Sequence, residues 1–132
     1  MIKFVDADEI LHIRNKVLRN GKLNPDECRF PTDKISGAFH LGAYVAGKLV
    51  SITSVHPQSY GEFIGDGYQL RGMATTPEYQ GRGFGNQLLN FATVYLREQK
   101  AGYLWCNARK VALKFYRDCG FETISGEFEI KG

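Results

Sequence analysis

Residues 68–85 read YQLRGMATTPEYQGRGFG, and this segment decides the fold. Its first part, Leu70–Thr75, is a predicted strand, because apolar residues there lie among aromatic and branched neighbours. Pro77 cannot donate to a continuing ladder, so the strand is expected to end before it. Three glycines within five residues follow, and an amphipathic helical pattern begins at Asn86. The segment therefore predicts a strand, a glycine-rich turn and a helix.

The glycine-rich turn has the features of a phosphate site. At the N-terminus of a helix, backbone N–H groups point outward unpaired and the helix dipole favours negative charge. Gly81, Gly83 and Gly85 lack Cβ atoms, so an anion can approach the backbone closely. Arg82 adds a cation with several donors. The turn is therefore expected to bind phosphate groups.

Spacing separates three phosphate-binding designs. A Walker P-loop requires Lys and then Ser or Thr after its last glycine, whereas Asn86 and Gln87 follow Gly85. A dinucleotide fingerprint requires G-x-G-x-x-G, but Gly85 comes one place too early and no acid ends the next strand, which argues against a nucleotide-binding oxidoreductase. Residues 80–85 fit a third pattern, Q/R-x-x-G-x-G/A. This is the signature of the GNAT superfamily of N-acetyltransferases, which the segment resembles.

Length and composition predict one folded domain over residues 1–132. Apolar residues make up 43% and charged residues 23%, which is ordinary for a soluble protein. The net charge of +3 includes no run of five like charges, so neither nucleic acid nor a membrane surface is an expected partner. The chain begins without the apolar region of a signal peptide, and no apolar run approaches the ~20 residues of a membrane helix.

Cysteine and histidine usage predicts a cytoplasmic protein without a metal site. Cys28, Cys106 and Cys119 are far apart and odd in number, which favours reduced thiols over a disulfide framework or a zinc ribbon. His40 and His56 lack i,i+4 or cysteine partners. Both are therefore expected to be ordinary strand residues.

The remaining patterns predict a mixed α/β fold with a βαβ crossover in its second half. A short strand over residues 2–5 precedes a helix that Asp6 caps, and Arg14, Lys16 and Arg19 are assigned to the solvated face of this helix. Gly72 indicates a bulge or a close backbone approach in its strand. Further elements are strands at 39–45, 49–55 and 103–106, a hairpin turn at Ala46-Gly47, helices beginning at Asn24-Pro25, after the glycine turn and after Asn107, and short extended pieces at 121–125 and 128–130.

A second motif strengthens the family resemblance. Residues 107–121 read NARKVALKFYRDCGF, which resembles the GNAT pattern N-x-x-x-x-A-x-x-F-Y-x-x-x-G-F. With the glycine turn, the resemblance covers the chain from about Ile2 to Phe128. It implies a mixed, largely antiparallel sheet that splays apart between the fourth and fifth strands, flanked by about four helices.

The resemblance also implies where acetyl-coenzyme A binds. The acyl-pantetheine arm would enter the splayed sheet and pair with the backbone of Met73, Ala74 and Thr75. The pyrophosphate would lie on the amides of Gln80, Gly81, Arg82, Gly83, Phe84 and Gly85. Asn107 would contact the pantetheine arm, and Tyr116 would face the sulfur.

The implied reaction is transfer of an acetyl group from acetyl-coenzyme A to a primary amine by direct attack in a ternary complex. The developing oxyanion needs preorganised donors, which a free N–H of a bulged strand can supply. A tyrosine with a pKa near ~10 stays protonated at neutral pH, so Tyr116 can protonate the departing thiolate. Without the resemblance, Tyr116 is read as an amphipathic residue packed at a helix edge.

Some features leave alternatives open. Small-molecule and peptide amines, including amino acids, polyamines, antibiotics and protein lysines, all fit as acceptors. A non-catalytic acyl-coenzyme A sensor or interaction module is the competing function. The resemblance places the first helical region in the wall of the acceptor site, which offers Arg14 as a residue that meets substrate.

The chain departs from the family at two places. Many relatives carry a carboxylate on the central strand, where this chain has Gln69 and Arg71. The general base is therefore left open. Glu62, Asp66 or Glu78 could act through a water, or none of the three is the base. Cys106 as a nucleophile would need a base and a lowered pKa, and no histidine near it can be argued from the sequence. Only residues 127–132 remain for the closing strand, which predicts a short strand or one borrowed from a partner in a homodimer.

Overall fold

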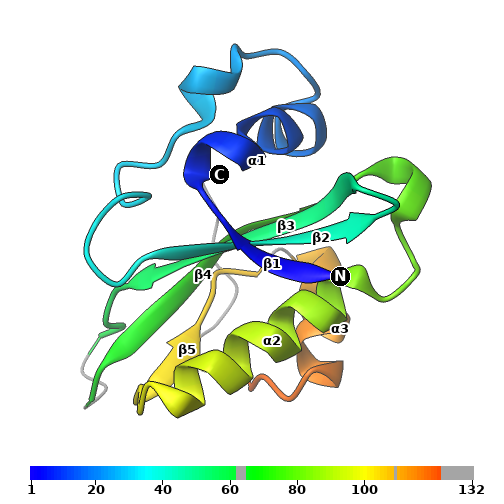
Figure 1. The fold of residues 1–132 in the computed structure, drawn as a ribbon. Coiled ribbons are helices and arrows are strands. Elements are labelled where there is room, and N and C mark those ends of the chain that lie inside the picture. The colour runs from blue at the N-terminus through cyan, green and yellow to red at the C-terminus, as the bar shows by residue number, and fades with distance from the viewer. Residues whose placement is uncertain (62–64, 109, 123–132) are drawn as a thin grey trace.

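The computed structural model describes residues 1–61, 65–108 and 110–122. Its centre is a five-stranded sheet in the order β1-β2-β3-β4-β5 (Figure 1). The first four strands are antiparallel to their neighbours, and β5 is parallel to β4. The strands are β1 (Ile2–Val5), β2 (Phe39–Val45), β3 (Lys48–Pro57), β4 (Gly67–Thr75) and β5 (Tyr103–Trp105). The mixed, largely antiparallel sheet expected from the sequence is confirmed.

The number of helices differs from the prediction of about four. The described residues contain three α-helices, which are α1 (Ala7–Ile13), α2 (Phe84–Glu98) and α3 (Leu113–Asp118). The short helix expected to begin at Asn24-Pro25 is present as a 3-10 turn with Asn24 as its N-cap, and no amphipathic pattern follows it to support a longer helix. The short helical segments are a π-helical turn, η1 (Arg14–Leu18), and three 3-10 turns, η2 (Pro25–Cys28), η3 (Pro77–Tyr79) and η4 (Lys110–Ala112).

Helices cover both faces of the sheet. Figure 1 shows α2 and α3 on one face and α1 on the other. The apolar side of α2 packs on the first face through fully buried Leu88, Leu89 and Ala92. On the other face, α1 buries Ile10 and Ile13 against β3 and β4. The sheet is therefore the central layer of one domain core.

Two predicted backbone features of the strands are confirmed. Ala46 and Gly47 have φ angles of +50° and +79°, the left-handed pair that a tight two-residue hairpin needs. Gly72 has a φ of +65° and lies where the β3–β4 register shifts by one residue, which makes it part of a β-bulge. A Cβ on Gly72 would come within 3.1 Å of the Phe30 ring, so this glycine also allows a close approach.

The sheet opens between β4 and β5, as predicted. Only Gly67, Tyr68 and Gln69 of β4 pair with β5. Beyond them, Leu70, Arg71, Ala74 and Thr75 pair with β3 and with no other described strand. One edge of this half of β4 is therefore open to a ligand. The closing pieces predicted at 121–125 and 128–130 fall largely on residues 123–132, which lie outside the described residues, so the short or borrowed closing strand stays a prediction. Across the described ranges, no helix combines the length and the apolar character needed to cross a bilayer.

Candidate functional site

A cavity of about 580 Å³ lies along the open half of β4. It brings together the end of β4, the glycine turn, the start of α2, one face of α3 and Val17 of η1. Eight of the ten residues predicted to bind acetyl-coenzyme A line it, and only Arg82 and Asn107 do not. The described lining residues are Val17, Met73, Ala74, Thr75, Tyr79, Gln80, Gly81, Gly83, Phe84, Gly85, Asn86, Phe115, Asp118 and Cys119.

The glycine turn at one end of this cavity is shaped for close approach to backbone. Gly81 and Gly83 have φ angles of +76° and +85°, a region in which residues with a Cβ are strained. A Cβ built at either position meets nothing within 4 Å, so the space beside the turn is open. Gly83 precedes α2 and has no side chain to cap the first amides of the helix. Uncapped amides and the helix dipole at such a position favour negative charge.

Tyr79 is a part of the site that sequence reasoning missed. Its ring lies 6.0 Å from the Phe84 ring in an edge-to-face arrangement, and the Arg82 guanidinium lies over it at 5.1 Å. Arg82 therefore stacks beside the cavity and does not line it. The nearness of Tyr79 to the Gln80–Gly85 pattern was the available signal, because residues of one turn share one surface.

Tyr116 is half-buried on α3, and it is not among the residues that line the cavity. Its ring makes edge contacts with Phe115 at 5.1 Å and Phe121 at 5.5 Å. Burial, and then the nearby thiols of Cys106 and Cys119, raise the pKa of Tyr116 well above its ordinary value. The phenol is therefore protonated at neutral pH, as an acid must be. Its neighbour Phe115 reaches the cavity.

Cys106 has the opposite of the properties that a nucleophile needs. Burial raises the pKa of its thiol to about 11. The thiolate is therefore scarce at neutral pH, which argues against a covalent acetyl-cysteine mechanism.

The described carboxylates proposed as general base do not line the cavity. Asp66 is exposed, and its backbone carbonyl accepts hydrogen bonds from the amides of Gly102 and Tyr103. Glu78 is exposed, lies 3.9 Å from the Lys16 ammonium, and has a pKa lowered by its own amide and by that cation. A lowered pKa makes a carboxylate a weaker base. Glu62, the third candidate, lies outside the described residues.

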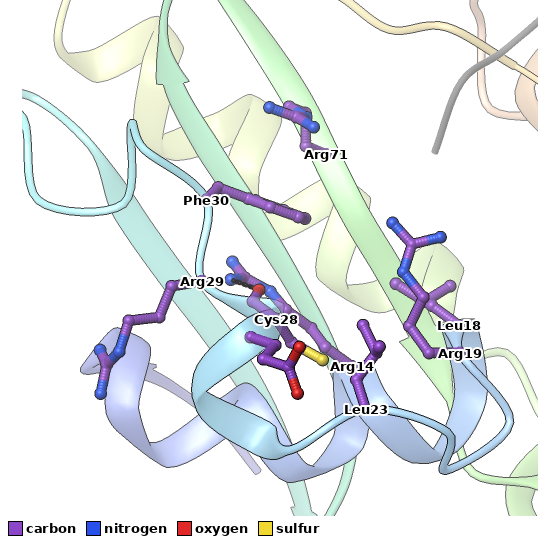
Figure 2. Close-up of a pocket in the computed structure, with 9 residues that line it drawn as sticks. Arg14, Leu18, Arg19, Leu23, Cys28, Arg29, Phe30 and Arg71 are labelled. Carbon is purple, nitrogen blue, oxygen red and sulfur yellow. Dashed lines mark hydrogen bonds between the residues drawn. The ribbon is translucent and has the colours of Figure 1, made fainter.

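The protein also has a second, smaller cavity of about 130 Å³. Figure 2 shows the residues that line it. Its wall is formed by η1, by the segment from Leu23 to Phe30, and by Arg71 of β4. The sequence did not predict it, because residues 22–37 have no apolar periodicity that would place them on the sheet. The described lining residues are Arg14, Leu18, Arg19, Leu23, Glu27, Cys28, Arg29, Phe30 and Arg71.

Arg14 lies at the base of this smaller cavity, and its assignment to a solvated face is wrong. The side chain is 1% exposed and forms a double hydrogen bond with Asp33, at 2.8 Å and 2.9 Å. It also donates to the Ser54 hydroxyl at 2.7 Å and to the Cys28 carbonyl at 3.0 Å. The signal was present in the sequence, because Arg14 follows Ile10 by four positions and so lies on the buried side of the helical segment.

Buried histidines extend this polar layer across the sheet. His40 contacts the Ser54 hydroxyl at 2.7 Å and the Asp33 carbonyl at 2.9 Å. His56 contacts Thr32 at 3.2 Å and Gln69 at 3.0 Å, and burial lowers the pKa of its imidazole. Both histidines are strand residues, as predicted. Their hydrogen bonds tie the segment around Asp33 to the sheet and so hold the wall of the smaller cavity.

Phe30 separates two cations of that wall. The Arg14 guanidinium lies 3.8 Å from the ring centroid and the Arg71 guanidinium 4.2 Å from it. Figure 2 shows the two arginines on opposite sides of the ring. Phe30 is held in turn by its amide, which donates to the Asp33 carboxylate at 2.9 Å. The ring therefore fixes the direction of Arg71 by stacking.

Comparisons with known proteins agree with this architecture. Residues 37–123 match the acetyltransferase (GNAT) domain family. An uncharacterized N-acetyltransferase, YitI of Bacillus subtilis (strain 168), is 33% identical over 132 residues, which are 99% of this chain and 88% of the relative.

Solved structures share the fold at lower identity. The apo aminoglycoside 6'-N-acetyltransferase AAC(6')-Ig of Acinetobacter haemolyticus superposes with a TM-score of 0.78 at 15% identity, covering 100% of this chain and 97% of that one. A predicted acetyltransferase of Clostridium acetobutylicum, crystallised with acetyl-CoA, superposes with a TM-score of 0.74 at 16% identity, covering 99% and 96%. The family match over residues 37–123 and the 33% identity to the Bacillus relative show that the chain belongs to the GNAT family of acetyltransferases.

Proposed function

We propose that this protein transfers an acetyl group from acetyl-coenzyme A to a primary amine by direct attack in a ternary complex. The observation that carries the proposal is the 580 Å³ cavity, which runs along the open half of β4 to the glycine turn at the start of α2. The family supports an amine as acceptor, and the related Clostridium structure with acetyl-CoA supports the donor.

The residues present fit the donor. The backbone of residues 80–85 would hold the pyrophosphate, because the space beside Gly81 and Gly83 is open and the turn leads into a helix N-terminus. The backbone of residues 73–75 would pair with the pantetheine arm, since this edge of β4 has no partner in β5. Acetyl-coenzyme A supplies the acyl group as an activated thioester. Arg82, stacked on Tyr79 beside the turn, would add positive charge near the phosphates.

Two groups of the chain would serve the chemical step. The β-bulge at Gly72 interrupts the β3–β4 ladder next to the cavity, and a backbone N–H freed there could stabilise the oxyanion. Tyr116 would protonate the departing thiolate, since its raised pKa keeps the phenol protonated. Asn107 would contact the pantetheine arm, because it lies just beyond the end of β5, separated from Trp105 only by Cys106.

Release of free thiol from acetyl-coenzyme A tests the proposal. Thiol formation that depends on added primary amine, with the acetylated amine identified by mass spectrometry, is the expected result. Coenzyme A binding without amine-dependent release from any of a broad panel of amines would instead identify a binding module.

Gly83→Val tests the glycine turn. A valine there is strained, and its side chain occupies the open space in which the pyrophosphate would lie. Each lost charge-assisted hydrogen bond is worth about 1.5–3 kcal/mol, so we expect affinity for coenzyme A to fall roughly tenfold to a hundredfold. Isothermal titration calorimetry with coenzyme A measures this loss.

Gly47→Val is the matched control. Gly47 has a φ of +79°, close to the +85° of Gly83, and a Cβ there also meets nothing within 4 Å. It lies in the β2–β3 hairpin, outside the cavity lining. Both variants should lose comparable stability through backbone strain, and only Gly83→Val should lose affinity. Equal affinities of the two folded variants for coenzyme A would mean that the pyrophosphate does not bind at the glycine turn.

A further inference from the structure

The wall of the smaller cavity in Figure 2 carries four arginines, and the described carboxylates form ion pairs with only some of them. Two of its four arginines are paired: Arg14 binds Asp33, and Arg29 binds Asp8 and Asp26. Arg29 also points away from Arg19 and Arg71 in Figure 2. Arg19 and Arg71 form no ion pair with a carboxylate of the described ranges. Two cations at this wall therefore have no carboxylate partner within residues 1–61, 65–108 and 110–122.

The carboxylate on the cavity wall does not fill that role. Glu27 is exposed and accepts a hydrogen bond from the Asn24 amide at 3.0 Å, as the cap of the 3-10 turn η2. One buried donor is also unused, because the Arg14 Nε–H has no hydrogen-bond partner in the part of the chain that the structure describes. Buried donors without a partner are costly and are rare in native proteins. Among the described residues, the wall of the cavity thus has more positive charge and hydrogen-bond donors than carboxylates to match them.

The position of the Arg71 guanidinium is electrostatically unfavourable. Burial, followed by the positive charges of Arg14 and Arg19, lowers the pKa of its guanidinium, although Asp33 acts in the opposite direction. Its ring contact with Phe30 keeps the cation at the cavity despite this penalty. A bound anion would relieve the repulsion, and a preorganised, partly desolvated arginine binds an oxyanion more strongly than a free surface arginine.

The small cavity adjoins the larger cavity, in which acetyl-coenzyme A is proposed to bind, along two elements. Val17 lines the large cavity, and the next residue, Leu18, lines the small one. On β4, Met73 lines the large cavity and Arg71 the small one, with the bulge at Gly72 between them. A small acceptor molecule could therefore place one group at Arg71 and still extend to the end of the larger cavity.

We propose that the small cavity binds an oxyanionic group, a carboxylate or a phosphate, of the acceptor, with Arg71 and Arg19 as its cationic contacts. The acceptor is then a small amine that carries negative charge, and polycationic amines are disfavoured by the same two arginines. The volume of about 130 Å³ suits such a group, since a cavity of about 150 Å³ admits a molecule of benzene size. This inference rests on the proposed acetyl transfer and specifies its substrate class.

Matched pairs of amines test the inference. Glycine is compared with glycinamide and O-phosphoethanolamine with ethanolamine, so that each pair differs in the oxyanion. We expect kcat/KM for the anionic member of at least one pair to exceed that of the neutral member tenfold or more. The pair that shows the preference identifies carboxylate or phosphate as the group bound.

Arg71→Gln should remove this preference. We expect it to raise KM for the anionic amine roughly tenfold to a hundredfold, while kcat/KM for the neutral partner changes little. Arg71→Lys should restore part of the preference, because it keeps the charge and loses the planar fork. Arg97→Gln, an equal charge change on the exposed side of α2, is the control and should leave the preference intact. Arg19→Gln, expected to weaken the preference, serves as a second variant if Arg71→Gln does not fold.

A binding experiment separates this inference from the proposed function. Each of the four amines is titrated calorimetrically into the protein with coenzyme A. If no amine is acetylated, the proposed function fails, and saturable binding of an anionic amine that Arg71→Gln abolishes still supports the anion site. The inference is overturned if the neutral amines bind and turn over as well as the anionic ones or better. It is also overturned if the preference for the anionic amines survives both Arg71→Gln and Arg19→Gln.

Discussion

Tyr116→Phe is expected to lower kcat roughly 10²–10⁴-fold, with coenzyme A affinity and melting temperature nearly unchanged. The substitution keeps the ring, and so its edge contacts with Phe115 and Phe121. Only the hydroxyl is lost. A large fall in kcat therefore reports the chemistry of the phenol, whereas a purely packing role predicts little change in rate.

The pH profile and the leaving group sharpen this test. Because burial raises the pKa of Tyr116, the phenol stays protonated up to at least its ordinary pKa near ~10, and kcat should show no basic limb from this residue below that pH. The loss in Tyr116→Phe should shrink with an acyl donor whose leaving thiol is more acidic, because such a thiolate needs less protonation.

Tyr95→Phe is the matched control for Tyr116→Phe. Tyr95 is also half-buried and packs its ring edge-to-face with Phe4 and Phe39, but it lies on α2 outside the cavity lining. Its variant should keep wild-type kcat. If Tyr116→Phe also turns over at the wild-type rate at every pH, a different group or a water is the acid, and Tyr116 is a packing residue.

Asp33→Asn is expected to destabilise the protein by about 3–5 kcal/mol, a large part of the stability of an ordinary domain. The substitution keeps the shape of the side chain but leaves the Arg14 cation, 1% exposed, without its counter-charge. It also weakens the anchor of the Phe30 amide, so the stacking that positions Arg71 should loosen. Urea denaturation monitored by circular dichroism measures the change in the free energy of unfolding.

The effect of Asp33→Asn should depend on pH in one direction. Burial by itself would raise the pKa of Asp33, but the hydrogen bonds from Arg14 and from the Phe30 amide outweigh it and lower the pKa. A carboxyl whose pKa is lowered in the folded state stabilises the fold above its unfolded value near ~3.9, and this contribution disappears as pH falls through the folded pKa. The difference in stability between wild type and variant should therefore shrink in acid.

Asp8→Asn provides the contrast for Asp33→Asn. Asp8 also pairs with an arginine, Arg29, but this pair is exposed to solvent. Water solvates both groups when an exposed pair is broken, so the variant should unfold at nearly the wild-type urea concentration. Equal effects of the two substitutions would mean that the buried Arg14–Asp33 pair contributes no more than a surface pair.

Local sequence was sufficient to predict much of the wall of the larger cavity. The left-handed conformations of Gly81 and Gly83 and the helix that follows them depend on residue type and short-range spacing. The same holds for the hairpin at Ala46-Gly47 and the bulge at Gly72. These features could be predicted because neighbours in the chain determine them. Eight residues that the family resemblance assigns to acetyl-coenzyme A also line one cavity.

Only the tertiary structure decided the smaller cavity and the burial of Tyr116. The Arg14–Asp33 pair joins residues 19 positions apart, and the bond from Arg14 to Ser54 spans 40 positions, in a region where residues 22–37 carry no periodic pattern. Whether Phe115 or Tyr116 reaches the cavity depends on how α3 packs on the sheet, and the sequence pattern does not contain that rotation. Contacts between distant segments are set by the packing of the whole core, so the cavity around Arg71 emerges only when the chain is folded.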